Sequence, residues 1–444
     1  MNQHKHAQGL QLTRRGVMQT GLAALGGAVG LGAVAACSDE ADSQDGEIRI
    51  VVAGSNDDAP LWEELIGKFN EQFPDISARP EFLTAPAGSD PWTGFFSTVQ
   101  TRIAGGEKYD IVYIPTEGQL LFSSRGLIEP LDSFVEEDQA TVDEFESDVE
   151  PNIIDQFYAH APEDGSRYFV PLGYNDTAIM YRKATFEEAG VELPVSGWTW
   201  DEFRAKAEEL KAAGIQYPMR FGTNLFDMMP WLLTNGTAVL TDDWTASRLN
   251  EPAAEEAVRF IAGFVADGLA PVPGGQFNAN AAMERGELAM TFGARGGVLG
   301  LRDRGVTESD YGYVQIPSNA ASGTSIGIGA FGMFADSQQK DACWSFLRFV
   351  MSQEFQDYIA EKVLMGVSPI RTSSATSDAM LQNSPDNTLE LFEATKTAVL
   401  VPGVVNQAAV ADPFDRFMTQ MLAGTLDPAE GLATLHQQIT EALA

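Results

Sequence analysis

Two overlapping glycine motifs have a spacing that could serve nucleotide binding or nucleophilic catalysis. Gly327–Gly332 matches G-x-G-x-x-G, and Gly323–Gly327 matches G-x-S-x-G with Ser325 in the nucleophile position. The first chemistry needs a helix that opens within the motif to receive a pyrophosphate, and the second needs a helix directly after the serine. Glycine, isoleucine and phenylalanine dominate the residues after Ser325 and favour a strand over a helix. The sequence therefore predicts a bent, glycine-rich strand here.

Histidine and cysteine are too scarce to build a metal site. They stand at His4, His6, His160, His436, Cys37 and Cys343. A zinc cage needs four such ligands close together, so we expect neither a metal nor another cofactor. His436 follows Ser325 in the order that a hydrolase triad would need, but it falls in a terminal helix and is expected at the surface.

Strands and helices alternate in the part of the chain that precedes residue 120. We expect strands at 48–53, 79–83 and 110–114, with amphipathic helices between them. The third strand is apolar throughout, which is typical of a parallel sheet covered on both faces. Such a βαβ arrangement collects ligands at the carboxyl ends of its strands, and it places residues 54–58 and 115–119 on one rim.

The second half of the chain predicts a further α/β region. Residues 168–171, 178–181 and 311–316 favour strands, and helices are expected over 199–213, 252–267 and 338–362. Thr199 and Glu202 have the spacing of a capping box, so they mark the start of their helix. The residues from Thr388 onward are mostly helical in pattern.

Length and charge exclude several classes of function. The chain has 444 residues, more than the ~250–300 that one hydrophobic core supports, so at least two domains are expected. The formal net charge is -35, and since the first 37 residues carry +3 the remainder carries -38. So acidic a body repels nucleic-acid phosphates and anionic lipid surfaces, which excludes both as partners.

The N-terminus has the pattern of an export signal. Arg14 and Arg15 resemble a twin-arginine signal, and an apolar run from Gly21 to Ala36 is shorter than the ~20 residues that a membrane-spanning helix needs. The run ends in Val-Ala-Ala-Cys, which resembles a bacterial lipobox and makes Cys37 a lipid-modified N-terminus after cleavage. We therefore expect a lipoprotein signal over residues 1–37, a polar tether over 38–47, and a protein held on the outer face of the cytoplasmic membrane.

Several segments together resemble one known family. They are Tyr168–Tyr181 followed by Trp198–Phe203, Gly286–Met290, Ile326–Phe355 and Gly366–Arg371. In this order, behind a lipobox, they resemble the family 1 extracellular solute-binding proteins of ABC importers, the group that contains maltose-binding protein. The similarity covers nearly all of residues 47–444.

The resemblance implies a two-lobed α/β fold of the periplasmic-binding-protein type (type II), with the ligand in a cleft between the lobes. The first lobe would comprise residues 48–173 and 327–368, and the second would comprise 174–326 and 369–444. Hinge strands would lie near Leu172–Asn175, Ser325–Phe331 and Pro369. Glycine at these positions permits the change in backbone torsion that closure requires.

The resemblance also implies a set of ligand-binding residues. Carboxylates and an amide at strand ends would bind hydroxyl groups, hinge residues would contact the ligand, and two exposed tryptophans would stack on sugar rings. Arg295 stands where many sugar binders carry a tryptophan, and it would bind an acidic, phosphorylated or hydroxyl-rich ligand. The expected residues are Asn56, Asp57, Asp58, Glu117, Tyr174, Asn175, Asp176, Trp92, Trp231, Arg295 and Arg371. Trp62, Trp200 and Trp344 are expected in the core.

The expected function is that of a monomeric, lipid-anchored substrate-binding component that delivers a sugar to a separate ABC permease, without enzymatic activity. One alternative is a binder of another solute, such as a polyamine, a sugar phosphate or glycerol phosphate. A second alternative is a secreted hydrolase, which would need a nucleophile system that the scarce histidines and cysteines do not provide.

Overall fold

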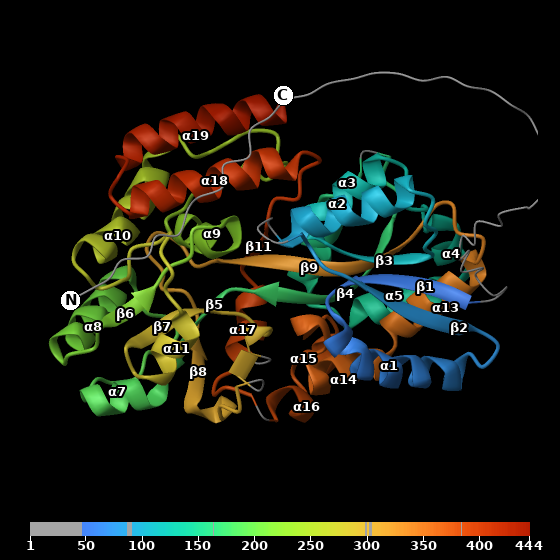
Figure 1. Cartoon of the computed structure of the whole chain (residues 1–444), viewed down its shortest axis with the longest axis horizontal. Coiled ribbons are helices and arrows are strands. Elements are labelled where there is room, and N and C mark those ends of the chain that lie inside the picture. The colour runs from blue at the N-terminus through green and yellow to red at the C-terminus, as the bar shows by residue number, and fades with distance from the viewer. Residues whose placement is uncertain (1–46, 87–90, 163, 298–299, 302–303, 383) are drawn as a thin grey trace, which may run out of the picture. The chain divides into compact units, whose positions relative to one another are not determined.

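The computed structural model describes residues 47–444 apart from 87–90, 163, 298–299, 302–303 and 383. The expected signal, the lipid attachment at Cys37 and the tether up to residue 46 lie outside the described residues. The described residues belong to one compact unit. Its described part contains two β-sheets, each covered by helices (Figure 1).

The larger sheet has seven strands in the order β10-β4-β9-β3-β1-β2, with β11 added beside β9. β1 pairs in parallel with both β2 and β3, as the βαβ pattern predicted. Helices lie on both faces of this sheet, with α2 and α3 on one side and α1 on the other (Figure 1). The bounds are β1 (Glu47–Ala53), β2 (Ser77–Leu83), β3 (Ile111–Pro115), β10 (Ser368–Pro369), β11 (Ala398–Leu400), α1 (Ala59–Gln72), α2 (Pro91–Ala104) and α3 (Thr116–Ser124).

The smaller sheet has four strands in the order β6-β7-β5-β8. β6 and β7 are parallel, whereas β5 runs antiparallel to both β7 and β8. The bounds are β5 (Ala178–Arg182), β6 (Tyr217–Arg220), β7 (Leu288–Gly293) and β8 (Tyr311–Val314). We call the regions around the larger and the smaller sheet the first and the second lobe; their boundaries along the chain stay predictions.

Two long strands, β4 (Phe169–Asp176) and β9 (Thr324–Met333), pair with each other and lead from one sheet toward the other. After β4, the chain continues through Thr177 directly into β5 of the smaller sheet. The pairing shifts register between Pro171 and Gly173. A Cβ atom on Gly173 would lie 2.6 Å from the carbonyl oxygen of Ser368, so glycine is required for this close approach of β10.

The remaining helices pack around the two sheets. α8 begins at the predicted capping box, in which the Thr199 hydroxyl accepts from the Glu202 backbone N–H and the Glu202 carboxylate accepts from the Thr199 N–H. α18 and α19 pack on each other and on α10. The bounds are α4 (Asp132–Glu137), α5 (Gln139–Ser147), α6 (Pro151–Ala159), α7 (Lys183–Ala189), α8 (Trp200–Ala212), α9 (Leu225–Thr234), α10 (Pro252–Ala266), α11 (Ala279–Glu284), α13 (Lys340–Met351), α14 (Gln353–Lys362), α15 (Thr372–Ala375), α16 (Asp378–Leu381), α17 (Leu389–Thr395), α18 (Gln407–Leu422) and α19 (Pro428–Leu443).

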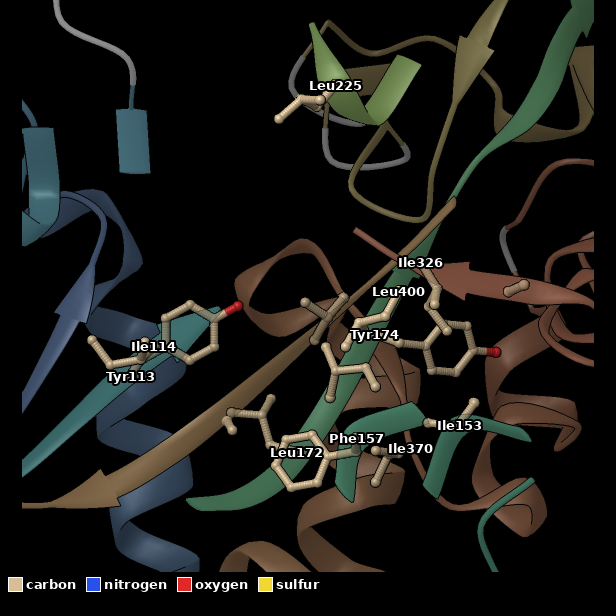
Figure 2. Packing of buried hydrophobic residues seen from close by; sticks show 14 of the residues in the cluster. Tyr113, Ile114, Ile153, Phe157, Leu172, Tyr174, Leu225, Ile326, Ile370 and Leu400 are labelled. Atoms are coloured by element: carbon tan, nitrogen blue, oxygen red, sulfur yellow. The ribbon is translucent and has the colours of Figure 1, made fainter. Parts of the chain in front are cut away.

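The buried core confirms the predicted places of three tryptophans. Trp62, Trp200 and Trp344 are at most 6% exposed. The Trp62 ring packs edge-on against Phe331 of β9, which couples α1 to the larger sheet. Figure 2 shows the part of the core around the crossing strands, where Tyr174 lies among buried aliphatic side chains.

The glycine motifs lie in β9 apart from Gly323, which directly precedes it, so they form a strand as predicted. Ser325 is buried in β9 and its hydroxyl donates to the Phe226 carbonyl at 2.8 Å, so it has no nucleophile geometry. His436 lies half-buried in α19.

Candidate functional site

A cavity of about 440 Å³ lies between elements of the two lobes. The first lobe contributes side chains of α2, β3 and α3, and the second contributes the start of α9 and the start of α18. Asn175 of β4 and two glycines of β9 form the part of the lining that belongs to the crossing strands. The cavity therefore lies where a relative movement of the lobes would change its width.

An aromatic wall bounds the cavity on the side of the first lobe. Trp92, the second residue of α2, is half-buried and stacks on Phe96 with ring centroids 6.5 Å apart. Its ring centroid lies 6.0 Å from that of Tyr113 on β3. A Cβ atom on Gly118 would lie 2.5 Å from the Phe96 ring, so a glycine in α3 allows α2 to approach and fixes the wall.

Acceptor groups face the same cavity. Glu117 follows β3 in the first turn of α3, and Asp227 lies in the first turn of α9. Asn175 points into the cavity from β4, and its side-chain oxygen is buried with no hydrogen-bond donor among the described residues. A buried acceptor without a donor costs free energy, and a ligand hydroxyl or amine placed there would satisfy it.

The position of Asp227 depends on two neighbours. The Asn224 side-chain oxygen caps α9 by accepting from the Asp227 backbone N–H at 2.9 Å, while the Asn224 amide donates to the Asp227 carboxylate at 3.2 Å. A Cβ atom on Gly222 would lie 1.8 Å from that carboxylate, so the side chain needs glycine there. Burial raises the pKa of Asp227, and the nearby Arg220 guanidinium opposes the rise.

Three of the predicted ligand residues line this cavity, namely Trp92, Glu117 and Asn175. The turn Asn56–Asp58 does not line it. Asn56 and Asp57 are exposed, and the Asp58 carboxylate instead accepts from the Ser55 backbone N–H at 3.0 Å. The cause is local, because this strand-end loop closes on itself as a capping box before α1 begins.

Tyr174 and Asp176 are a correction to the expected hinge contacts. Side chains alternate along β4, so these two point away from the face that Asn175 presents to the cavity. Both are completely buried. Desolvation raises the pKa of both groups well above its ordinary value, and neither Asp176 oxygen has a hydrogen-bond donor in the described structure.

Trp231 is a second correction, since the structure buries it completely instead of exposing it. It lies within α9, and its ring centroid is 5.4 Å from those of Phe203 and Phe221. Met-Met-Pro before it continues the helix, with Pro230 tolerated inside. Trp231 therefore packs the core of the second lobe, and it does not line the cavity.

The two predicted arginines serve as structural anchors. Arg295 is completely buried and donates to the Ser384 hydroxyl at 2.7 Å and to the Ala360 carbonyl at 2.9 Å. Arg371 donates to the carboxylates of Glu144 at 2.6 Å and Asp148 at 3.3 Å. Neither side chain lines the cavity, so the expectation that Arg295 reads an acidic ligand there is corrected.

Sequence reasoning missed Asn224, Asp227 and Gln407, which also line the cavity. The first two could have been noticed in the sequence, because an N-cap residue followed three positions later by an acidic residue marks the start of a helix. Thr199 and Glu202 have the same spacing at the start of α8. Gln407 begins α18, and its side-chain oxygen accepts from the Val404 backbone N–H at 3.2 Å. Nothing in its local sequence marks it as a cavity residue.

The described residues include no group of three metal-ligating side chains. In the same part of the chain, no helix has the length and apolar character that crossing a membrane requires.

Solved structures of known proteins are similar to this chain in fold. A Listeria monocytogenes ABC substrate-binding protein, solved with cycloalternan, is 22% identical and has a TM-score of 0.76, covering 89% of this chain and 98% of the other. The sugar-binding protein MalE of Xanthomonas citri is 19% identical with a TM-score of 0.74, covering 89% and 97%. At these identities the likeness concerns the fold, and it confirms the expected two-lobed α/β architecture.

The sequence comparisons identify the family. A binding protein of Brucella abortus (strain 2308) is 26% identical over 413 residues, which cover 89% of this chain and 92% of the relative. The family model described as bacterial extracellular solute-binding protein matches residues 53–357. The chain therefore belongs to the bacterial extracellular solute-binding protein family, as its resemblance indicated.

Proposed function

We propose that this protein binds a carbohydrate in the cavity between its lobes and is the substrate-binding component of an ABC importer. The observation that carries the proposal is the lining of the cavity. An aromatic wall at Trp92 faces acceptors at Glu117, Asn175 and Asp227, and the described lining contains no basic side chain. A sugar presents apolar C–H faces and a rim of hydroxyl donors, and it needs this combination.

Each group has a distinct task in this proposal. Trp92 stacks on one face of a sugar ring. Glu117 accepts hydrogen bonds from sugar hydroxyls on the side of the first lobe, and Asp227 accepts them on the side of the second lobe. Asn175 accepts through its buried oxygen from the crossing strand. A hydrogen bond to a charged group contributes ~1.5–3 kcal/mol, so either carboxylate changes affinity by about 10- to 100-fold.

Proteins of similar fold support the ligand class. The Listeria structure contains cycloalternan, and the GacH receptor of Streptomyces glaucescens, with a TM-score of 0.73, was solved with acarbose. A solute-binding protein of Agrobacterium vitis, with a TM-score of 0.65, was solved with D-mannitol. These ligands are all rich in hydroxyl groups.

The family and the crossing strands support a role in transport. In our proposal, β4 and β9 act as hinges, the lobes close on the sugar, and the closed monomer presents a surface to the separate permease. Cys37 carries the lipid that holds the protein at the outer face of the membrane. The protein binds its solute without converting it.

A polyamine is the second candidate ligand, because two carboxylates and an aromatic ring also suit an extended cation. Sugar phosphates and glycerol phosphate are disfavoured in this cavity by Glu117 and Asp227. Isothermal titration calorimetry of the purified protein with mono- and oligosaccharides, polyols, spermidine and glycerol 3-phosphate tests the proposal. We expect a saccharide to bind most tightly and to be recovered unchanged; tight binding of spermidine alone, or a cleaved saccharide, would contradict it.

A further inference from the structure

A second, more open cavity of about 940 Å³ adjoins the first within the second lobe. The two linings share Ala294 and Gly296, so a bound molecule can extend from one space into the other. We call this space the annex. Its polar lining comes from β6, from β7, from α11 with the loop that leads into it, and from Arg304.

The charge of the annex is opposite to that of the first cavity. Arg220 and Arg304 line the annex together with the amides Gln276 and Asn278, and its described lining contains no carboxylate. Acidic residues outnumber basic ones by 63 to 28 in this chain of 444, so a lining whose charged residues are all basic departs from the average composition. The first cavity has the reverse composition, with two carboxylates and no basic side chain in its described lining.

Arg220 lies at the boundary between the two spaces. It is the last residue of β6, in register with Thr291 of β7, which also lines the annex. Its guanidinium nitrogen Nη1 is 4.0 Å from the Asp227 carboxylate of the first cavity, and 39% of its side chain is exposed. The pair is loose, so the guanidinium can reach a second anion with its remaining donors.

Arg304 faces the annex from a glycine-rich wall. A Cβ atom on Gly300 would lie 3.2 Å from Arg304 Nη1, so the absence of a side chain at position 300 gives the guanidinium its room. The Arg304 Nε atom donates to Glu284, which itself does not line the annex. This contact uses Nε, and the other nitrogens remain available as donors.

We propose that the annex binds an oxyanion, a carboxylate or a phosphate, carried at one end of a saccharide whose neutral ring occupies the first cavity. This inference rests on the proposed function. The two arginines bind the oxyanion by charge-assisted hydrogen bonds, while Glu117 and Asp227 exclude it from the first cavity. The opposite charges of the two spaces therefore orient the ligand, with its acidic end toward Arg220 and Arg304.

Calorimetric titration with matched saccharides tests the proposal. The probes are neutral disaccharides of gluco, galacto and manno configuration, each beside its uronic-acid homologue and its 6-phosphate. We expect one acidic homologue to bind at least 10-fold more tightly than its neutral partner, and the comparison of uronate with phosphate identifies the oxyanion. Arg220→Gln with Arg304→Gln should weaken acidic binding by about 10- to 100-fold. Arg304→Gln alone should weaken acidic binding about 10-fold and change neutral binding less than about 2-fold, because Arg304 does not line the first cavity.

Two further variants separate binding from folding. Arg285→Gln is the matched control, because Arg285 is 58% exposed, pairs with Glu287 and lines neither cavity. Arg220→Lys keeps the positive charge and should retain most of the preference for the acidic homologue.

Three results would overturn the inference. If neutral and acidic saccharides bind equally, or if Arg304→Gln weakens both alike, the annex has no role in charge recognition and the proposed function stands. If no saccharide of either kind binds, the proposed function fails together with the inference.

Discussion

The Thr116 hydroxyl accepts a hydrogen bond from the backbone N–H of Ile328 at 2.8 Å. This bond joins the first residue of α3 to the crossing strand β9, although the two residues are 212 positions apart in the chain. Both residues are buried, so no solvent replaces the contact. The bond fixes Glu117, the next residue, relative to β9, which lines the cavity with two of its glycines.

Thr116→Val tests this connection, because it preserves the shape of the side chain and removes the acceptor. The buried N–H of Ile328 then loses its partner, and we expect the free energy of unfolding to fall by ~1–3 kcal/mol. Thr98→Val is the control, since the Thr98 hydroxyl bonds within its own helix α2. Urea unfolding that shows equal, small effects for both variants would contradict the connection.

Trp92 and Trp231 should respond to alanine substitution in opposite ways. Trp92→Ala removes the stacking surface of the cavity, so it should abolish measurable sugar binding while the protein stays folded. Trp231→Ala leaves a void in the core of the second lobe and should cost ~3–5 kcal/mol of unfolding free energy. Titration calorimetry and urea unfolding measure the two effects, and loss of binding without loss of stability in Trp231→Ala would contradict the assignment.

Asp176 should make stability depend on pH. Burial raises its pKa in the folded state above the unfolded value of about 3.9. A group whose pKa is raised on folding is protonated more readily in the folded state. Its contribution to the free energy of unfolding is therefore most favourable below pH 4 and is lost as the pH rises toward the folded pKa. Asp176→Asn should therefore be more stable than the wild type at pH 7, with the difference shrinking toward pH 4.

Asp243 provides the opposite case for the same experiment. Hydrogen bonds from Thr241 and Thr245 lower its pKa to about 2. Its contribution is present above the unfolded pKa of about 3.9 and is lost as the pH falls through 2. Asp243→Asn should reduce stability at pH 7 and have little effect near pH 2. Thermal unfolding across this pH range measures both variants, and slopes of the same sign would contradict the account.

The lipid anchor predicts a clear change in location. Cys37→Ala removes the residue that the lipobox pattern marks for lipidation, so the protein should move from the membrane fraction into the soluble fraction. Cys343→Ala is the matched control, because Cys343 is a buried thiol in α13 and has no part in anchoring. Cell fractionation and immunoblotting measure the location, and a Cys37 variant that stays with the membrane would refute the anchor.

The sequence predicted the elements more reliably than the directions of their side chains. The apolar strand before Glu117 and the capping box at Thr199 depend on local patterns, and the structure places both as expected. The number of polar residues at a strand end, in contrast, does not reveal whether a loop folds onto itself, as Asn56–Asp58 does.

The remaining differences between the predicted and the observed site concern which side chains are buried. Asn175 and Asp176 are neighbours on one strand, but pleating presents the first to the cavity and buries the second. Arg295 pairs with Ser384, which lies 89 residues later in the chain. Such a long-range partner leaves no local trace in the sequence, so the burial of Arg295 could not be foreseen.

Calorimetric titration of the wild type and of Asp227→Asn with the same saccharide tests the central claim most directly. Asp227→Asn keeps the size of the side chain and removes the charged acceptor that α9 contributes to the cavity. We predict that the wild type binds one saccharide per chain and that the variant, folded and equally stable, binds it about 10- to 100-fold more weakly. A wild type that binds no saccharide, or a variant that binds it with unchanged affinity, would contradict the claim that this cavity is the sugar site.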